Sequence, residues 1–171
     1  MDGKADTAMG AILIVDDERN IRETLAMYIR VLGHTVETAA DGETAMEAID
    51  RREFDLVVSD IRMEGLGGLG LLSQIREQQS GTAVVLMTAY ATASQAVEAI
   101  RLGAYGFLMK PFSPNDVRLL INQVLDVRTS QRKDAPVRRG SNHPGGPSSV
   151  PLRVLHQVKH GPFPFGREGQ S

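Results

Sequence analysis

The sequence lacks cysteine, and it lacks any apolar run that approaches the roughly 20 residues of a membrane span. Without cysteine, the chain can form neither a disulfide framework nor a thiolate metal site, and it gives no sign of an oxidising compartment. The first ten residues are small and polar and contain no apolar signal core. These absences argue against a membrane protein and predict a cytoplasmic, soluble one.

Charge is unevenly distributed along the 171 residues, whose formal net charge is -2. Residues 1–129 hold 12 basic and 19 acidic residues, a balance of -7, whereas residues 130–171 hold 7 and 2, a balance of +5. The second segment also holds six of the eight prolines. Such a segment buries too little apolar surface to offset its ordering entropy. We therefore expect a disordered N-terminus over 1–9, one folded domain over 10–129, and a disordered basic Pro/Gly-rich tail over 130–171.

The tail suggests two further functions, and the sequence favours neither. His143, His156 and His160 are possible metal ligands, but prolines and glycines surround them and break the helix on which the last two would share a face. The basic charge suits nucleic-acid phosphates, yet the tail has neither a fold nor an aromatic platform for bases. A solvated linker is the favoured interpretation, and we do not expect this chain to bind DNA directly.

Short apolar runs alternate with helical patterns through the first 129 residues. This alternation predicts a doubly wound α/β fold, in which a five-stranded parallel sheet of flavodoxin-like order 2-1-3-4-5 is covered by five helices. The predicted strands are 11–15, 35–38, 55–59, 82–88 and 105–109. The predicted helices are 19–32, 43–52, 69–78, 94–102 and one that starts near Pro114. In the fourth helix we expect Val97 and Ile100 to face the core.

Polar side chains stand at the ends of four of the predicted strands. Asp16 and Asp17 follow the first strand, Asp60 follows the third, Thr88 ends the fourth and Lys110 follows the fifth. The carboxyl ends of parallel strands meet at one edge of the sheet, where α/β folds place their sites. Three carboxylates, one hydroxyl and one lysine at a common edge predict a site for a divalent cation and a phosphoryl group.

The residue types define what this site can do. Mg²⁺ prefers oxygen ligands and binds through one or two carboxylates together with phosphate. Asp60 suits three roles, as a ligand, a general base or a nucleophile that forms an acyl phosphate. Lys110 supplies a positive charge and Thr88 a hydroxyl donor to phosphoryl oxygens. Taken singly, the aspartates could cap a helix and Lys110 could be solvated, so the prediction depends on their combination.

Four segments, LIVDDE, VVSDIRM, VLMTAY and GAYGFLMKPF, together resemble the receiver domain of two-component response regulators. The resemblance covers about residues 10–128 in one colinear stretch. The segment 88–112 looks most like receivers of AAA+-type transcription activators. The combination of the four motifs is specific, although no single motif would be.

The resemblance implies a role for each residue of the metal and phosphoryl site. Asp60 corresponds to the phosphoacceptor, which also contacts Mg²⁺. Asp17 corresponds to a direct Mg²⁺ ligand, Asp16 to its acidic partner acting through water, and the backbone carbonyl of Arg62 to a further ligand. Lys110 corresponds to a phosphoryl contact, and the family pattern implies a cis bond from Lys110 to the following proline.

The resemblance also implies a switch. Thr88 corresponds to the phosphoryl contact that reports phosphorylation, and Phe107 to an aromatic side chain that turns inward when Thr88 moves. The sequence departs from the family pattern after Met63, where Glu64 replaces the usual proline and precedes a glycine-rich stretch over 65–68. We expect this departure to affect the geometry of the loop and the lifetime of the phosphate.

The predicted function is a phosphorylation-dependent signalling switch, not an enzyme beyond intrinsic phosphotransfer and autodephosphorylation. A sensor histidine kinase or a phosphotransfer protein would phosphorylate Asp60 with Mg²⁺, and the face of the fourth helix, fifth strand and fifth helix would bind an unidentified downstream protein or a second copy. Alternatives are a degenerate receiver used only for interaction, or an N-terminal fragment of a transcription regulator. A hydrolase needs a general acid where Arg62 stands, and a flavin-binding protein would not suit the acidic first loop.

Overall fold

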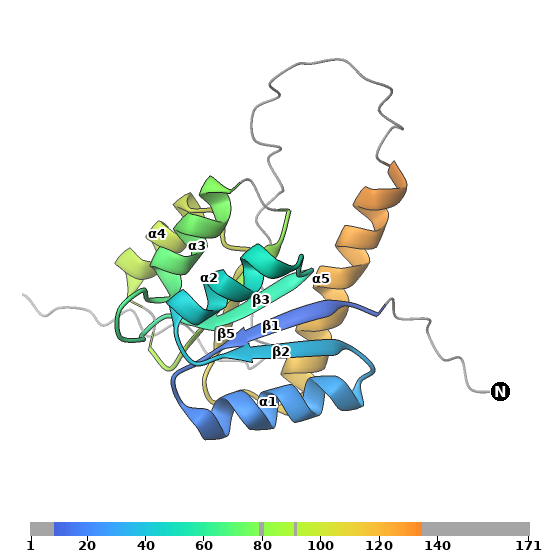
Figure 1. Cartoon of the computed structure of the whole chain (residues 1–171), viewed down its shortest axis with the longest axis horizontal. Coiled ribbons are helices and arrows are strands. Elements are labelled where there is room, and N and C mark those ends of the chain that lie inside the picture. The colour runs from blue at the N-terminus through green and yellow to red at the C-terminus, as the bar shows by residue number, and fades with distance from the viewer. Residues whose placement is uncertain (1–8, 79–80, 91, 135–171) are drawn as a thin grey trace, which may run out of the picture.

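The computed structural model describes residues 9–78, 81–90 and 92–134 (Figure 1). Within these residues the chain forms one five-stranded sheet and five helices. The strands are β1 (Ala11–Val15), β2 (Thr35–Ala39), β3 (Leu56–Asp60), β4 (Ala83–Thr88) and β5 (Gly106–Met109). The helices are α1 (Arg19–Val31), α2 (Gly42–Arg51), α3 (Gly68–Glu77), α4 (Ala93–Arg101) and α5 (Pro114–Asp134).

All neighbouring strands are parallel, and their order is β2-β1-β3-β4-β5. This confirms the predicted doubly wound sheet and its flavodoxin-like strand order. β1 and β3 are central neighbours, and Val15 at the end of β1 lies opposite Ser59 near the end of β3. The register therefore brings the residues that follow β1 next to Asp60, the last residue of β3.

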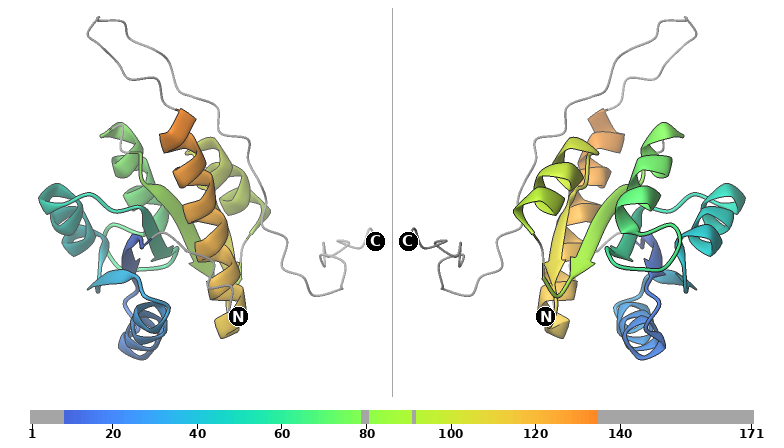
Figure 2. Two further views of the ribbon diagram at one scale, coloured as in Figure 1. Left: turned by 90° about the vertical axis from the view of Figure 1, so that its right-hand side faces the viewer. Right: turned by 90° about the vertical axis from the view of Figure 1, so that its left-hand side faces the viewer.

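Helices cover both faces of the sheet and create two hydrophobic cores. Ile12 and Ile14 pack into the core beneath α1 and α5, whereas Leu13 and Val15 pack into the core beneath α2, α3 and α4. The right-hand view of Figure 2 shows α4 in front of the sheet and α5 behind it. Because β3 and β4 are covered on both faces, they are buried along their whole length, and their side chains are apolar except for Ser59, Asp60 and Thr88 near the carboxyl ends.

The helices begin and end at residues that suit these positions. The Asp41 side chain caps α2 by accepting the Thr44 amide at 2.7 Å. Thr92 and Gln95 form a reciprocal capping box at the start of α4. Gly33 follows α1 with a φ of 95°, a backbone conformation that glycine adopts without steric cost. Among the described residues, no helix is long and apolar enough to cross a membrane.

The prediction that Val97 and Ile100 face the core is wrong. Val97 is 57% exposed and Ile100 is 41% exposed, while Ala99 is the buried residue of α4. The small Ala99 side chain contacts the core beneath α2 and α3. Helical periodicity identifies an apolar stripe but does not say whether the stripe faces the core or the solvent. The structure thus leaves an apolar stripe of α4 on the surface.

The predicted domain end at residue 129 lies within helix α5. Helix α5 continues to Asp134, and Figure 1 shows its last turns extending beyond the sheet. The segment 130–134 reads Ser-Gln-Arg-Lys-Asp and contains no helix breaker, while the next proline is Pro136. The remaining predictions for 1–8 and 135–171, including the histidines of the tail, lie outside the described residues.

A buried histidine connects the start of β1 to the end of α1. The Nδ1 atom of His34 accepts the Gly10 amide at 3.3 Å, so this nitrogen carries no proton. Burial holds the pKa of His34 below its ordinary value of 6.5. At pH values between the lowered pKa of folded His34 and the ordinary pKa of 6.5, the unfolded chain therefore binds more protons than the folded chain. The stability that neutral His34 supplies is lost as the pH falls below the pKa of the unfolded chain.

We predict that the free energy of unfolding decreases as the pH falls from about 7 to about 5, and that His34→Asn reduces this slope, because asparagine accepts the same amide without titrating. Urea denaturation followed by circular dichroism measures both slopes. An unchanged slope in the variant would show that other groups cause the acid sensitivity.

Candidate phosphoryl and metal site

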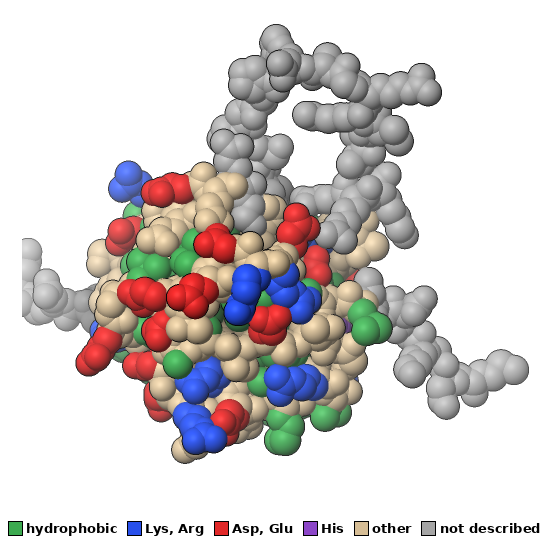
Figure 3. All heavy atoms as spheres, in the orientation of Figure 1, with side chains coloured by type: hydrophobic (Ala, Val, Ile, Leu, Met, Phe, Trp, Pro, Cys, Tyr) green, Lys and Arg blue, Asp and Glu red, His purple; other side chains and the backbone are tan. Residues whose placement is uncertain are grey.

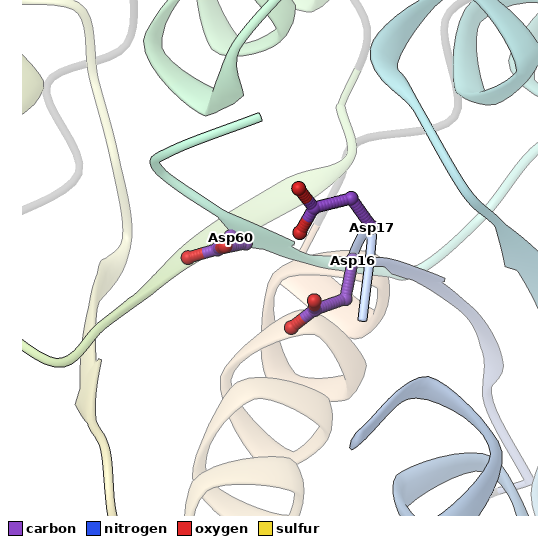
Figure 4. A group of neighbouring side chains, drawn as sticks. All are labelled: Asp16, Asp17 and Asp60. Carbon is purple, nitrogen blue, oxygen red and sulfur yellow. The ribbon is translucent and has the colours of Figure 1, made fainter. Parts of the chain in front are cut away.

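Three carboxylates converge at the carboxyl end of the sheet. Asp16 and Asp17 directly follow β1, and Asp60 ends the neighbouring β3. One carboxylate oxygen from each residue lies within 4.8 Å of the other two, which is a suitable spacing for ligands of a common cation. Figure 4 shows the three side chains pointing toward a common space. The predicted meeting of these residues at one edge is therefore present in the structure.

Asp16 is fully buried and is fixed by four contacts. Its Oδ1 accepts the Glu18 amide at 2.8 Å, and its Oδ2 accepts from Lys110 Nζ at 3.0 Å. Its own amide donates to the Ala39 carbonyl at 3.2 Å, and its carbonyl accepts from Arg22 Nη1 at 2.6 Å. A buried carboxylate is tolerated because it is hydrogen-bonded and paired with a positive charge.

Lys110 extends from the end of β5 into the carboxylate cluster. Its Nζ lies 3.0 Å from Asp16 Oδ2, 3.7 Å from Asp60 Oδ1 and 4.0 Å from Glu18 Oε1. Burial lowers the pKa of Lys110, but the hydrogen bond and charge of Asp16, with the charges of Asp60 and Glu18, raise it overall. Lys110 is therefore protonated at neutral pH. The Lys110–Pro111 bond is cis, as the resemblance implied.

Asp60 is buried next to charges of the same sign. Burial is the largest cause that raises its pKa, and the charges of Asp16 and Asp17 add to it, while Lys110 and the Arg62 amide lower it. The net direction is upward because one lysine does not compensate burial together with two neighbouring carboxylates. The ionised site therefore carries excess negative charge, which a divalent cation would relieve.

The loop after β3 packs tightly behind Asp60. The Ile61 amide donates to the Met87 carbonyl at 3.0 Å, and the Gly68 amide donates to the Ile61 carbonyl at 3.1 Å. A Cβ at Gly68 would lie 2.3 Å from the Asp60 carbonyl oxygen, which is closer than a side chain allows. Glycine at this position therefore lets the start of α3 approach the backbone of Asp60. Arg62, whose carbonyl we expect to contact metal, lies in this loop.

Thr88 lies at the end of β4, next to β5. It is buried, its Oγ1 accepts the Tyr90 amide at 3.1 Å, and its carbonyl accepts the Lys110 amide at 2.8 Å. Phe107 on β5 pairs with Leu86, two residues before Thr88 on β4. Phe107 is partly buried and packs against the core beneath α2, α3 and α4. A backbone hydrogen bond thus connects Thr88 to Lys110, whereas Phe107 lies deeper in the sheet.

Sequence reasoning missed three residues that support the site. Glu18 and Arg22 hold the two sides of Asp16, and the Glu43 carboxylate of α2 accepts the Leu66 amide in the loop after β3. Arg22 lies six residues after Asp16, in the first turns of α1, so its proximity could have been anticipated from helical geometry. No signal in the sequence connects Glu43 with Leu66.

We predict that Asp60→Asn raises the free energy of unfolding of the metal-free protein at neutral pH, because it removes a destabilising charge. The folded-state pKa of Asp60 is raised, so its destabilising effect is present above that pKa and disappears as pH falls below the unfolded value. The gain should therefore shrink in acid, as urea denaturation in the presence of a chelator can measure. A variant that is less stable at neutral pH would contradict the charge argument.

Comparison with protein families agrees with this geometry. The family model described as the response regulator receiver domain matches residues 12–122. The regulatory protein AtoC of Escherichia coli is 36% identical over 127 residues, which is 74% of this chain and 28% of that protein. The response regulator protein PilR of Pseudomonas aeruginosa is 34% identical over 143 residues, which is 84% of this chain and 31% of that protein.

Solved structures with a similar fold include other response regulators. The chemotaxis protein CheY4 of Vibrio cholerae has a TM-score of 0.66 and 32% identity, covering 69% of this chain and all of that chain. The receiver domain of NtrX from Brucella abortus has a TM-score of 0.63 and 39% identity, covering 67% of this chain and 98% of that chain.

These relatives confirm the likeness to receivers of AAA+-type transcription activators. The chain spans less than two thirds of the length of the first curated relatives it matches, from 28% to 56%. Through the matched segment, the charged site and the strand order, the chain belongs to the response regulator receiver domain family.

Proposed function

We propose that this chain is a two-component signalling switch in which Asp60 accepts a phosphoryl group from a phosphohistidine. The donor would be a sensor histidine kinase or a phosphotransfer protein. The observation that carries the proposal is the position of Asp60, whose Oδ1 lies 3.7 Å from Lys110 Nζ in the cluster with Asp16 and Asp17. Such a cluster combines a nucleophilic carboxylate, a positive charge and a set of ligands for a cation.

The residues present fit Mg²⁺. Their donor atoms are carboxylate oxygens within 4.8 Å of one another, and the raised pKa of Asp60 reflects charge that a cation would neutralise. Asp17 and Asp60 would bind the ion directly, Asp16 would bind through water, and the Arg62 carbonyl would complete the protein ligands. When bound, Mg²⁺ neutralises negative charge on the phosphoryl oxygens during transfer.

The transfer itself needs few groups of the protein. A carboxylate oxygen of Asp60 attacks phosphorus, the bond from phosphorus to the histidine nitrogen breaks, and that nitrogen keeps the electron pair. With one proton taken up from water by the imidazole ring of the donor, the products are an acyl phosphate on Asp60 and a neutral imidazole on the donor. The Lys110 ammonium would pair with one phosphoryl oxygen, and the Thr88 hydroxyl, which already accepts the Tyr90 amide, would donate its proton to another.

The output would pass from Thr88 to the face formed by α4, β5 and α5. Val97 and Ile100 on α4 and Leu119 on α5 are exposed apolar residues. Val97 and Ile100 lie about one helical turn apart, and exposed neighbouring apolar residues are typical of protein–protein contacts, which supports binding of a downstream protein or a second phosphorylated copy. Because α4 contributes a single buried residue, Ala99, a small shift of the helix would break few core contacts.

Phosphorylation is tested with a small-molecule phosphodonor and intact mass measurement. We predict that the wild-type protein gains one phosphoryl group in the presence of Mg²⁺, and that it gains none with a chelator. Asp60→Asn removes the nucleophile and should not be modified, while remaining folded by circular dichroism. A folded wild-type protein that gains no mass would support the alternative in which the domain serves only for interaction.

Transmission is tested by hydrogen exchange of the phosphorylated protein. We predict that phosphorylation changes amide exchange in α4 and β5 in the wild-type protein, and that Thr88→Ala still accepts the phosphoryl group but loses most of this change. Alanine leaves the carboxylate cluster intact but removes the hydroxyl that would contact the phosphoryl group. Equal changes in both proteins would exclude Thr88 as the connection.

A further inference from the structure

The loop that follows Asp60 contains residues that favour disorder. Four of the six residues from 65 to 70 are glycines: Gly65 and Gly67 lie in the loop, and Gly68 and Gly70 lie in the first turn of α3. Glycine loses more conformational entropy on ordering than any other residue, and Glu64 occupies a position where proline would have restricted the backbone. This loop also carries the Arg62 carbonyl, so its order matters for the proposed metal site.

A side chain from outside the loop holds its outer part. The Oε1 atom of Glu43, at the start of α2, accepts the Leu66 amide at 3.1 Å, although the two residues are 23 positions apart. The Glu43 side chain is exposed to solvent, so burial does not hold it in this position. Either a carboxylate or an amide oxygen can accept this backbone N–H. Glu43 therefore connects the first turn of α2 to the loop through a backbone atom.

Two glycines make room for this connection. A Cβ at Gly65, whose φ is +70°, would lie 2.8 Å from Glu43 Oε1. A Cβ at Gly42, the residue before Glu43, would lie 2.2 Å from the Leu66 carbonyl oxygen. The Gly42 distance is to a backbone atom, so the backbones of α2 and of the loop are in direct contact at Gly42, while Gly65 lies against the end of the Glu43 side chain. Gly65 in the loop and Gly42 in α2 thus leave space for the hydrogen bond between Glu43 and the Leu66 amide.

The inner part of the loop is held by the protein backbone. The Gly68 amide donates to the Ile61 carbonyl at 3.1 Å, and a Cβ at Gly67 would lie 3.0 Å from the same carbonyl oxygen. Arg62 lies between this closed inner part and the outer part held by Glu43. The position of its carbonyl therefore depends on both ends of the loop.

Acidic side chains gather on the same side of the molecule. Figure 3 shows red side chains on the side where β1 ends and α2 begins. The exposed acidic residues of these segments and of the loop after β3 are Asp17, Glu18, Glu43 and Glu64. Glu43 lies outside the three carboxylates that share a possible cation site among the described residues. The negative charge of Glu43 could attract a cation even without holding the loop. A test must therefore separate the effect of this charge from the effect of the hydrogen bond to the Leu66 amide.

We propose that Glu43 is a positioning residue that holds the loop after β3 in the conformation that binds Mg²⁺. This inference rests on the proposed function, because it assumes that the carboxylate cluster binds the ion. Glu43 acts through the Leu66 amide and is not itself a ligand. Without this hydrogen bond the loop occupies other conformations, and the apparent affinity for Mg²⁺ decreases by the fraction of molecules that remain competent.

Two substitutions of Glu43 separate the hydrogen bond from the charge. Glu43→Gln keeps an oxygen acceptor at the same reach but removes the charge, whereas Glu43→Asp keeps the charge but shortens the side chain by one methylene. We predict that Glu43→Asp weakens Mg²⁺ binding roughly three- to tenfold, the effect of losing one hydrogen bond, and that Glu43→Gln stays within about twofold of wild type. Isothermal titration calorimetry with Mg²⁺ alone measures all three affinities.

A second measurement needs no metal. In the metal-free protein, hydrogen exchange by NMR should show faster exchange of the Leu66 amide in Glu43→Asp than in wild type, and little change in Glu43→Gln. Glu47→Ala, an exposed acidic residue on the same helix, is the matched control and should leave both affinity and exchange unchanged. Equal urea midpoints of all the variants would show that none of them alters global folding.

The outcomes distinguish this inference from the proposed function. A wild-type protein that does not bind Mg²⁺ would refute the proposed function itself. If the wild-type protein binds Mg²⁺ and Glu43→Asp binds it equally well, the positioning role is refuted. If Glu43→Gln loses affinity and Glu43→Asp keeps it, or if Glu47→Ala loses as much as Glu43→Asp, charge alone explains the effect and the inference is overturned.

Discussion

Repulsion between carboxylates held close together is the interaction on which the rest of this structure depends. Asp16, Asp17 and Asp60 bring oxygens within 4.8 Å of one another, and Lys110 is the cation that pairs with Asp16 and approaches Asp60. The sheet forces this arrangement, because β1 and β3 are parallel neighbours that end at the same edge. In the proposed function, this repulsion is what a bound cation would relieve.

A site of this kind requires a rigid support. Cores on both faces bury the strands that carry the carboxylates, and the buried Asp16 is fixed through its amide, its carbonyl and both carboxylate oxygens. The support is lighter on α4, where the capping box fixes the first turn and Ala99 is buried while Val97 and Ile100 remain at the surface. The structure thus combines a buried, hydrogen-bonded charged centre with a helix that buries little of its own apolar surface.

Much of the fold and of the site could be predicted from the sequence. Buried parallel strands appear as short apolar runs, so the residues that follow them, such as Asp16 and Asp60, mark one edge of the sheet without further information. The orientation of α4 could not be predicted, because Val97 and Ile100 follow helical spacing as well as core residues do. The end of α5 at Asp134 could not be predicted either, because the polar residues 130–134 show no apolar periodicity.

The contacts that support the site are harder to predict than the site itself. The hydrogen bond from the Leu66 amide to Glu43 joins a loop to a helix start, and the two backbones approach each other closely at Gly42. Neither periodicity nor a motif encodes such an approach. From the sequence alone, the glycines of this loop indicate a flexible backbone. In the structure they allow close packing.

The most direct test of the electrostatic account is the stability of the wild-type protein as a function of Mg²⁺ concentration. A ligand that binds only the folded state raises the free energy of unfolding with the logarithm of its concentration once it exceeds the dissociation constant. The account predicts this rise for the wild-type protein and its near absence for Asp17→Asn, at constant ionic strength. A wild-type stability that does not change with Mg²⁺ would contradict the claim that a cation relieves the repulsion between the three aspartates.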